Sequence, residues 1–416
     1  MGVDLLEKAN KYLGEVCEGI GERCVGSRGN QAATGYFARS MEDAGFDLKI
    51  SEFTCFEWSH AGASLEVEGE SFQVSVSPYS LGCLQRAPLC SASSLEELKT
   101  VDPAGKILLL SGELTREPLM PKNFPFYNPA EHQLIVRLLE MGGCRGIAAA
   151  TSRNPAMAGG LYPFPFIEDG DFNVPSVYMT EREGERLLRR VGREGLLEIN
   201  AVRVPSKGCN VTARRGRGGG WKVVIFAHID TKQGTPGALD NGAGVVVLML
   251  LAHMLQGYNG SLQVELVALN GEDYYSNPGQ MLYLEENRHG FSDILLGVNI
   301  DGPGYREGDT AFSMYECPPF LEEPIRRAFS ADKGMVEGEP WLQGDHGLFL
   351  INNRPALALT SERLDKVLEI SHTPSDKRGV VAAGKLVAAA GALRRLIEDL
   401  NNEAPGRAAA EKKGMP

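Results

Sequence analysis

Acidic and imidazole side chains follow three apolar runs in the second half of the chain. VVIFA leads into His228, VELVALN leads into Glu272 and Asp273, and ILLGV leads into Asp301. In an open parallel sheet, ligands gather beyond the carboxyl ends of the strands, so we expect these side chains to converge in space. Burying that many acids without a cation would cost several kcal/mol apiece or force them to bind protons. The pattern therefore indicates a cation-binding site.

Two further candidate ligands lie in segments with the composition of loops. Asp240 stands in PGALDNGAG and His372 stands in SHTPSD. Two divalent ions need about three protein ligands each, with one carboxylate shared between them and a bridging water. Imidazole ligands favour zinc, with Co²⁺ or Mn²⁺ as alternatives, over magnesium or calcium. The predicted ligands, with Asp240 as the shared one, are His228, Asp240, Asp273, Asp301 and His372.

Two acids near these ligands are not needed to bind metal. Asp230 stands two residues after His228 on the predicted strand, where its carboxylate could orient the imidazole. Glu272 is an acid beside the ions, suited to take a proton from the bridging water and to give it to the leaving group. The predicted chemistry is metal-assisted hydrolysis.

The elements that must position these residues predict an α/β domain with a doubly wound, mostly parallel sheet. After residue 205, apolar strand runs alternate with helical segments, which is typical of a sheet covered on both faces. CNVTARR and WKVVIFAHID are expected to be adjacent strands joined by the turn RGRGGG. The expected helices of this part lie near 242–255, 279–289, 320–330 and 385–400.

Residues 58–204 have a different texture. Short alternating strands punctuated by Gly, Pro and Ser indicate a β-rich unit inserted into the larger domain, with a helix at 130–141 and a long loop between Asn154 and Pro175. The larger domain is then discontinuous and comprises residues 1–57 and 205–400. Residues 401–416 are expected to form a flexible tail.

Composition excludes several classes of partner. The chain has 416 residues, and its 42 Lys and Arg against 54 Asp and Glu give a net charge of −12, which disfavours nucleic acid. No apolar stretch is long enough to span a membrane, and the N-terminal residues do not resemble a secretory signal. The eight cysteines form no CxxC pair and are expected to be reduced thiols. We therefore expect a cytoplasmic protein, with its oligomeric state left open.

The same segments resemble, in order, the motifs of the M28 family of co-catalytic zinc aminopeptidases. The matching strings are AHID, PGALDNGAG, NGED, NID, GDHGLF and SHTPSD. GERCVGSRGNQAATGYFARSMEDAGFDLKISEF is similar to the opening segment of that family, and residues 58–204 are similar to the protease-associated domain often inserted there. The resemblance implies a zinc-exopeptidase-like fold.

The resemblance also implies a role for each residue. It makes Asp240 the bridge between two ions, Glu272 the general base, and the bond between Asp240 and Asn241 a cis peptide. The remaining ligands are His228 and Asp301, on different ions, together with Asp273 and His372.

Some positions depart from the pattern of the family or leave two interpretations open. Asp273 stands where a glutamate is usual, and its shorter side chain could alter metal affinity or preference. Gly344 replaces a serine that often precedes Asp-His, so Asp345 and His346 either line the substrate pocket or brace their loop. Tyr315 either steadies a tetrahedral oxyanion or simply packs in the interior.

The expected function is removal of N-terminal residues from peptides that have a free N-terminus. A carboxypeptidase, a dipeptidase or an amide deacylase on the same metal centre is the alternative. In related M20-type hydrolases the extra domain follows the acidic pair, whereas here the insertion precedes His228. A non-catalytic, receptor-like homologue predicts lost ligands, and none of the five is missing.

Overall fold

The computed structural model describes residues 2–151, 166–218, 220–341 and 343–411. The chain divides into two compact units. Unit 1 comprises residues 1–55, 207–274 and 278–416, and unit 2 comprises residues 56–206 and 275–277. The chain passes from one unit to the other within two long strands, β1 (Asp47–Val67) and β8 (Glu194–Arg215).

Unit 1 is built on a sheet with the strand order β13-β12-β14-β11-β9-β10-β8. Its four central strands, β14, β11, β9 and β10, run parallel to one another, and β8 and β12 pair with the outer two of them in antiparallel register. The fold class predicted from the sequence, a doubly wound and mostly parallel α/β sheet, is confirmed. The strand bounds are β9 (Lys222–His228), β10 (Gln263–Leu269), β11 (Ile294–Ile300), β12 (Thr310–Tyr315), β13 (Met335–Glu337) and β14 (Ala356–Ser361).

Strands β8 and β9 were predicted to be adjacent, and this prediction is wrong. Strand β10 lies between them: Leu266 is opposite Ala213 of β8 in antiparallel register and opposite Ile225 of β9 in parallel register. The glycine-rich turn suggested a hairpin. However, β10 is almost entirely buried, and a position between two strands gives its backbone N–H and C=O groups partners on both sides.

Alternate residues of β9 face two different hydrophobic clusters. Ile225 and Ala227 belong to the larger cluster, and Val224 and Phe226 belong to a smaller cluster on the opposite face. On the smaller side, Phe349 of α9 (Gly347–Leu350) stacks on Phe226 with ring centroids 4.7 Å apart. Helix α7 (Pro278–Asn287) contributes Tyr283 to the same cluster. The sheet is therefore covered on both faces.

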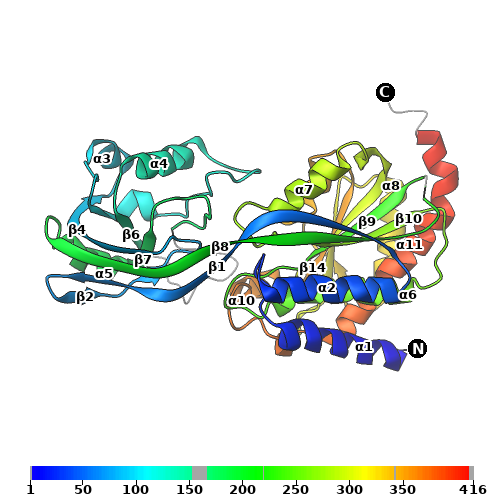
Figure 1. Cartoon of the computed structure of the whole chain (residues 1–416). Coiled ribbons are helices and arrows are strands. Elements are labelled where there is room, and N and C mark those ends of the chain that lie inside the picture. The colour runs from blue at the N-terminus through cyan, green and yellow to red at the C-terminus, as the bar shows by residue number, and fades with distance from the viewer. Residues whose placement is uncertain (1, 152–165, 219, 342, 412–416) are drawn as a thin grey trace. The chain divides into compact units, whose positions relative to one another are not determined.

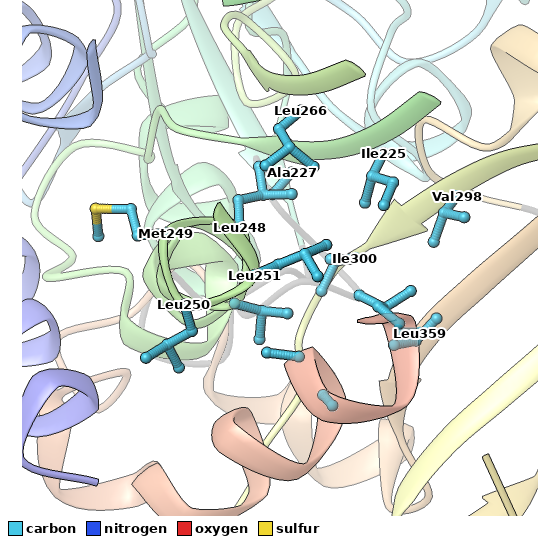
Figure 2. Packing of buried hydrophobic residues seen from close by; sticks show 14 of the residues in the cluster. Ile225, Ala227, Leu248, Met249, Leu250, Leu251, Leu266, Val298, Ile300 and Leu359 are labelled. Carbon is cyan, nitrogen blue, oxygen red and sulfur yellow. The ribbon is translucent and has the colours of Figure 1, made fainter. Parts of the chain in front are cut away.

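Helix α6 (Ala243–Met254) forms the centre of the larger cluster. Every residue from Ala243 to Ala252 is buried, as expected for a helix that is apolar all round. Figure 2 shows Leu248 and Leu251 of α6 beside labelled side chains of β9, β10, β11 and β14. This packing fixes the start of α6 next to the carboxyl ends of the strands.

Four further helices cover α6 and the same face of the sheet. Helix α1 (Gly2–Gly14) packs against α6 and α11 (Ala383–Glu411), α2 (Arg28–Asp43) packs against α6, and α8 (Pro319–Ser330) packs against α11. Figure 1 shows α1 and α2 in blue and α11 in red. The first and last helices of the chain thus share one layer.

The C-terminal helix is longer than predicted. Residues 401–411, expected in the tail, continue α11 as far as Glu411, and residues 412–416 lie outside the described part of the chain. Local propensity does not account for the extension, because it contains Pro405 and Gly406. Its first residue is anchored, since the side-chain oxygen of Asn401 accepts the backbone N–H of Leu262 (3.1 Å). Among the described residues, no helix combines the length and apolar character needed to cross a membrane.

Unit 2 contains a smaller sheet, whose strand β5 is buried on both faces. Leu108 and Leu110 of β5 face one hydrophobic cluster, and Ile107 and Leu109 face another. The strands are β2 (Glu70–Phe72), β3 (Ser75–Val76), β4 (Cys83–Ala92), β5 (Ile107–Leu110), β6 (Gly146–Thr151) and β7 (Ser176–Thr180). The helices are α3 (Leu95–Thr100), α4 (Ala130–Met141) and α5 (Glu181–Leu188). Its assignment as a protease-associated domain stays a prediction.

The packing of α6 gives a first prediction. Leu248 is fully buried, so Leu248→Ala should lower the free energy of unfolding by about 2–5 kcal/mol, through lost burial and the cavity left behind. Leu6→Ala, at a position that is 44% exposed in the same unit, serves as the control with a smaller loss. Denaturant unfolding followed by circular dichroism measures both, and equal losses would contradict the central place of α6.

Candidate active site

The three strand ends singled out by sequence meet at one edge of the unit 1 sheet. His228 is the last residue of β9, Asp301 directly follows β11, and Glu272 and Asp273 lie in the turn after β10. Strand β9 lies between β10 and β11, so the chain moves from β9 to one side and then to the other. Such a switch point opens a crevice at the carboxyl ends of the strands.

The other two predicted ligands come from loops on the same edge. Asp240 lies in η4 (Ala238–Gly242), directly before α6, at a kink where its own backbone is not helical (φ −115°, ψ 85°). The cis peptide bond expected between Asp240 and Asn241 is confirmed. His372 follows α10 (Leu364–Ile370). The Oδ1 atom of Asp240 lies 3.1 Å from Nε2 of His228, and its Oδ2 atom lies 3.1 Å from Nε2 of His372. One carboxylate thus faces two histidines with its two oxygens.

The candidate ligand atoms form overlapping groups. Within each group the atoms lie no more than 4.8 Å apart, and the groups are His228–Asp240–Asp301, Asp240–Asp273–His372 and His228–Glu272–Asp273. In the first two groups, Nε2 of His228 is 3.6 Å from Oδ1 of Asp301, and Nε2 of His372 is 2.9 Å from Oδ1 of Asp273. The structure therefore brings together all five predicted ligands and Glu272. Their binding of metal stays a prediction.

The cluster contains polar atoms that the protein itself leaves unsatisfied. Both ring nitrogens of His228, Oδ2 of Asp273 and Nδ1 of His372 are buried and make no hydrogen bond of good geometry with the described residues, although Nε2 of His228 lies 3.1 Å from Oδ1 of Asp240. A buried polar atom without a partner costs about 1–3 kcal/mol. Imidazole nitrogens and carboxylate oxygens are the donor set that zinc and similar ions accept, so the residues present fit a metal centre.

The buried carboxylates of the cluster favour positively charged groups near them. Burial alone would lower the pKa of His228, but the three carboxylates around it raise that pKa well above its usual value. Burial alone would raise the pKa of Asp240, but His372 and His228 hold it well below its usual value. Burial raises the pKa of Glu272 well above the usual range, and nearby acids raise it further. The cluster therefore attracts protons or bound cations.

Asp230 does more than the orienting role predicted from its place beside His228. Its Oδ1 atom lies 3.7 Å from Nδ1 of His228. The same fully buried carboxylate accepts the backbone N–H groups of Gly271 (2.8 Å), Glu272 (3.3 Å) and Asp273 (2.9 Å). Asp230 thus fixes the turn after β10, and with it the start of the side chains of Glu272 and Asp273.

The residues with two open interpretations are all enclosed. Oδ1 of Asp345 accepts a hydrogen bond from Gln280 (3.2 Å), and burial raises the pKa of Asp345 to about 7. Burial lowers the pKa of His346 to about 4, and its ring lies 4.4 Å from the ring of Tyr315. The hydroxyl of Tyr315 donates to the carbonyl of Trp341 and accepts its N–H, both at 2.8 Å. These contacts favour packing and loop bracing over an oxyanion role for Tyr315.

Sequence reasoning missed two basic side chains at this edge. The Nζ atom of Lys232 lies 4.0 Å from Oδ1 of Asp273. The side chain of Arg23, from the segment before α2, is fully buried and binds the carbonyls of Ile229 and Gly237. Lys232 had a signal, since it stands two residues after Asp230. Nothing about Arg23 links it to residues more than 200 positions later.

The bonds of Asp230 give a second prediction, which does not depend on metal. Asp230→Asn places an amide where three N–H donors point, and hydrogen bonds to charged groups contribute about 1.5–3 kcal/mol. In chelator-treated protein, the variant should lose at least that much free energy of unfolding in denaturant titrations. Asp47→Asn, at an exposed position, is the control. A loss no larger than that of the control would show that the turn holds itself.

Comparison with known proteins shows that the segment carrying this edge of the sheet is similar to a known family. Residues 210–397 match the sequence model of Peptidase family M28. The chain is 24% identical over 316 residues to the probable lipoprotein aminopeptidase LpqL of Mycobacterium tuberculosis, covering 71% of this chain and 59% of that protein. It is 22% identical over 316 residues to the aminopeptidase YwaD of Bacillus subtilis, covering 73% and 64%. The matches thus span about three fifths of the length of these relatives.

Solved structures share the fold. The aminopeptidase from Aneurinibacillus sp. strain AM-1 superposes with a TM-score of 0.72 at 18% identity, over 94% of this chain and 93% of that one. BSAP, a zinc aminopeptidase from Bacillus subtilis, gives 0.69 at 18% identity, over 95% and 94%. The sequence match over residues 210–397, the shared fold and the cluster at the strand ends agree, and this part of the chain is similar to peptidase family M28.

Proposed function

We propose that this chain is a metal-dependent aminopeptidase, which hydrolyses the N-terminal residue from peptides. The observation that carries the proposal is the carboxylate of Asp240, whose two oxygens face His228 and His372 from two sides. Another acid lies beside each histidine: the half-buried Asp301 beside His228, and the buried Asp273 beside His372. The family match and the names of the relatives support the same activity.

The proposed centre holds two divalent ions, with zinc as the expected metal. His228, Asp240 and Asp301 would hold one ion, and Asp240, Asp273 and His372 would hold the other. This grouping replaces the expectation that His228 and Asp301 bind different ions, because Nε2 of His228 lies 3.6 Å from Oδ1 of Asp301. Bound there, such ions polarise a carbonyl group and lower the pKa of water, so that hydrolysis proceeds near neutral pH.

Glu272 is the proposed general base and acid. It forms a group with His228 and Asp273, yet it is less buried than either of them. Its backbone is held by Asp230, so its carboxylate starts from a fixed point. In this position Glu272 takes a proton from the attacking water and returns it to the leaving amine.

The charge of the site favours a substrate with a free N-terminus. The acids at the strand ends present negative charge to an α-ammonium group, which would also set the register of cleavage at one residue. Lys232 is the observation that favours the rival function. Its ammonium group, beside Asp273, could instead pair with the terminal carboxylate of a dipeptide or of a carboxypeptidase substrate.

A pair of substitutions tests the roles of the two central acids. Glu272→Gln should lower turnover by roughly 10²–10⁴-fold while the protein keeps its metal, because the group moves protons and does not hold ions. Asp240→Asn should lose metal as well as activity, because the shared negative charge is removed. Elemental analysis gives the ions per chain, expected to be two in the unsubstituted protein. Loss of metal from Glu272→Gln with retention in Asp240→Asn would reverse the assignment.

Blocked peptides test the substrate class. A peptide with a free N-terminus should be shortened one residue at a time, and its acetylated form should resist, because acetylation removes the charge and adds bulk at the amine. Mass spectrometry of the four combinations of free and blocked termini, with a dipeptide added, separates the candidates. Release of C-terminal residues from acetylated peptides would replace the aminopeptidase by a carboxypeptidase and leave the metal centre untouched.

A further inference from the structure

The segment from Gly237 to Asp240 is held by two buried, charged side chains that come from distant parts of unit 1. Arg23 precedes α2, and Asp376 follows the His372 loop. We propose that Arg23 and Asp376 are positioning residues: Arg23 sets the place of Asp240 relative to His228, and Asp376 sets it relative to His372. Their consequence for metal binding rests on the function proposed above, whereas the positioning itself does not.

Arg23 forms a clamp on backbone carbonyls. Its guanidinium donates to Ile229 (2.9 Å), Pro236 (2.9 Å) and Gly237 (2.8 Å). It also donates to two carbonyls of its own N-terminal segment, at 3.2 and 2.7 Å. The backbone N–H of Arg23 completes the clamp with a hydrogen bond to Oγ1 of Thr231 (2.8 Å). One planar side chain therefore joins three stretches of backbone.

The carbonyls that Arg23 selects determine what it positions. Ile229 directly follows His228, and Gly237 lies three residues before Asp240. The loop from Thr231 to Pro236 separates them, and its two ends are held together at Arg23. The side chains of His228 and Asp240 lie 3.1 Å apart. Arg23 holds together the two backbone segments from which these side chains extend.

Asp376 holds the same segment from the opposite end. Its fully buried carboxylate accepts the N–H of Leu239 (2.7 Å) and the N–H of Asp240 (3.0 Å). Its backbone carbonyl accepts the N–H of Ala238 (3.2 Å). Asp376 lies only four residues after His372, and its own N–H bonds to the carbonyl of Thr373 (3.1 Å). One short, bonded loop therefore carries both His372 and the carboxylate that fixes Asp240.

The fit around Gly237 shows that this arrangement is tight. A Cβ atom at Gly237 would lie 2.2 Å from Cγ2 of Thr231, 2.5 Å from the carbonyl oxygen of Asp240 and 3.0 Å from Nη2 of Arg23. Its backbone is in the left-handed region, with φ of 55°. Only glycine therefore allows the clamp to close on this segment.

Burying two charged groups in order to stiffen a loop costs solvation free energy. Replacing a buried ionic group with well-packed apolar residues is often neutral or stabilising, so stability alone does not explain Arg23 and Asp376. Both side chains instead form hydrogen bonds with backbone atoms that lie within a few residues of His228, Asp240 and His372. Directional, charge-assisted bonds define atomic positions more closely than apolar contacts do.

Three variants of the full-length chain test the proposal. Asp376→Asn removes one of two acceptors for N–H groups, and Arg23→Lys keeps the charge but cannot reach all five carbonyls. Leu396→Ala is the matched control, because it empties a buried position on α11 and so destabilises the same unit while leaving the hydrogen bonds of Arg23 and Asp376 in place. Two measurements apply to each folded variant: hydrogen–deuterium exchange of residues 237–242 in chelator-treated protein, and Zn²⁺ affinity by competition with a chromogenic chelator.

The proposal predicts at least tenfold faster exchange of the Leu239 and Asp240 amides in Asp376→Asn. It also predicts a dissociation constant for Zn²⁺ raised by about 10–100-fold in both clamp variants, the range seen when supports of metal ligands are removed. Leu396→Ala should lower the melting temperature and leave both quantities unchanged. Exchange and Zn²⁺ affinity that follow only the melting temperature, as in the control, would overturn the proposal. If the unsubstituted protein binds no Zn²⁺, the proposed function fails, and the exchange result alone decides on the clamp.

Discussion

The structure of unit 1 depends on how buried negative charge is stabilised at the carboxyl ends of its central strands. Each acid there has its own solution. Asp230 is satisfied by three backbone N–H groups and Asp376 by two. Asp240 lies between two histidines, whereas Asp273 keeps an oxygen without a hydrogen-bond partner among the described residues. The first two acids therefore organise the backbone, and the others remain available to a cation.

This division explains why the sequence was informative about the site. A ligand at the end of an apolar strand is placed by the sheet itself, and parallel strands deliver their ends to one edge whatever their order. His228, Glu272 and Asp301 were therefore predictable as neighbours from their position after apolar runs alone. Asp240 and His372 come from loops, and only the ordered set of motifs linked them to the same edge.

The features that sequence could not provide all depend on long-range pairing. The place of β10 between β8 and β9 follows from competition among three apolar strands, and a glycine-rich turn carries no record of it. In the sequence, Arg23 cannot be distinguished from a surface arginine. Its partners are backbone carbonyls, which every residue has, so no residue type at the partner positions points to it. The cytoplasmic location and the nature of unit 2 stay predictions.

The short acid at position 273 shows how one substitution relative to the usual pattern can be accommodated. Its carboxylate is nearly fully buried, 2.9 Å from Nε2 of His372 and 4.0 Å from Nζ of Lys232. A longer side chain starting from the same fixed N–H would carry its oxygens past these partners, because Asp230 holds the backbone in place. Lys232 also offsets part of the negative charge of Asp273. In the proposed centre of two ions, the position that includes Asp273 should therefore be the weaker of the two, because its acid already shares its charge with a lysine.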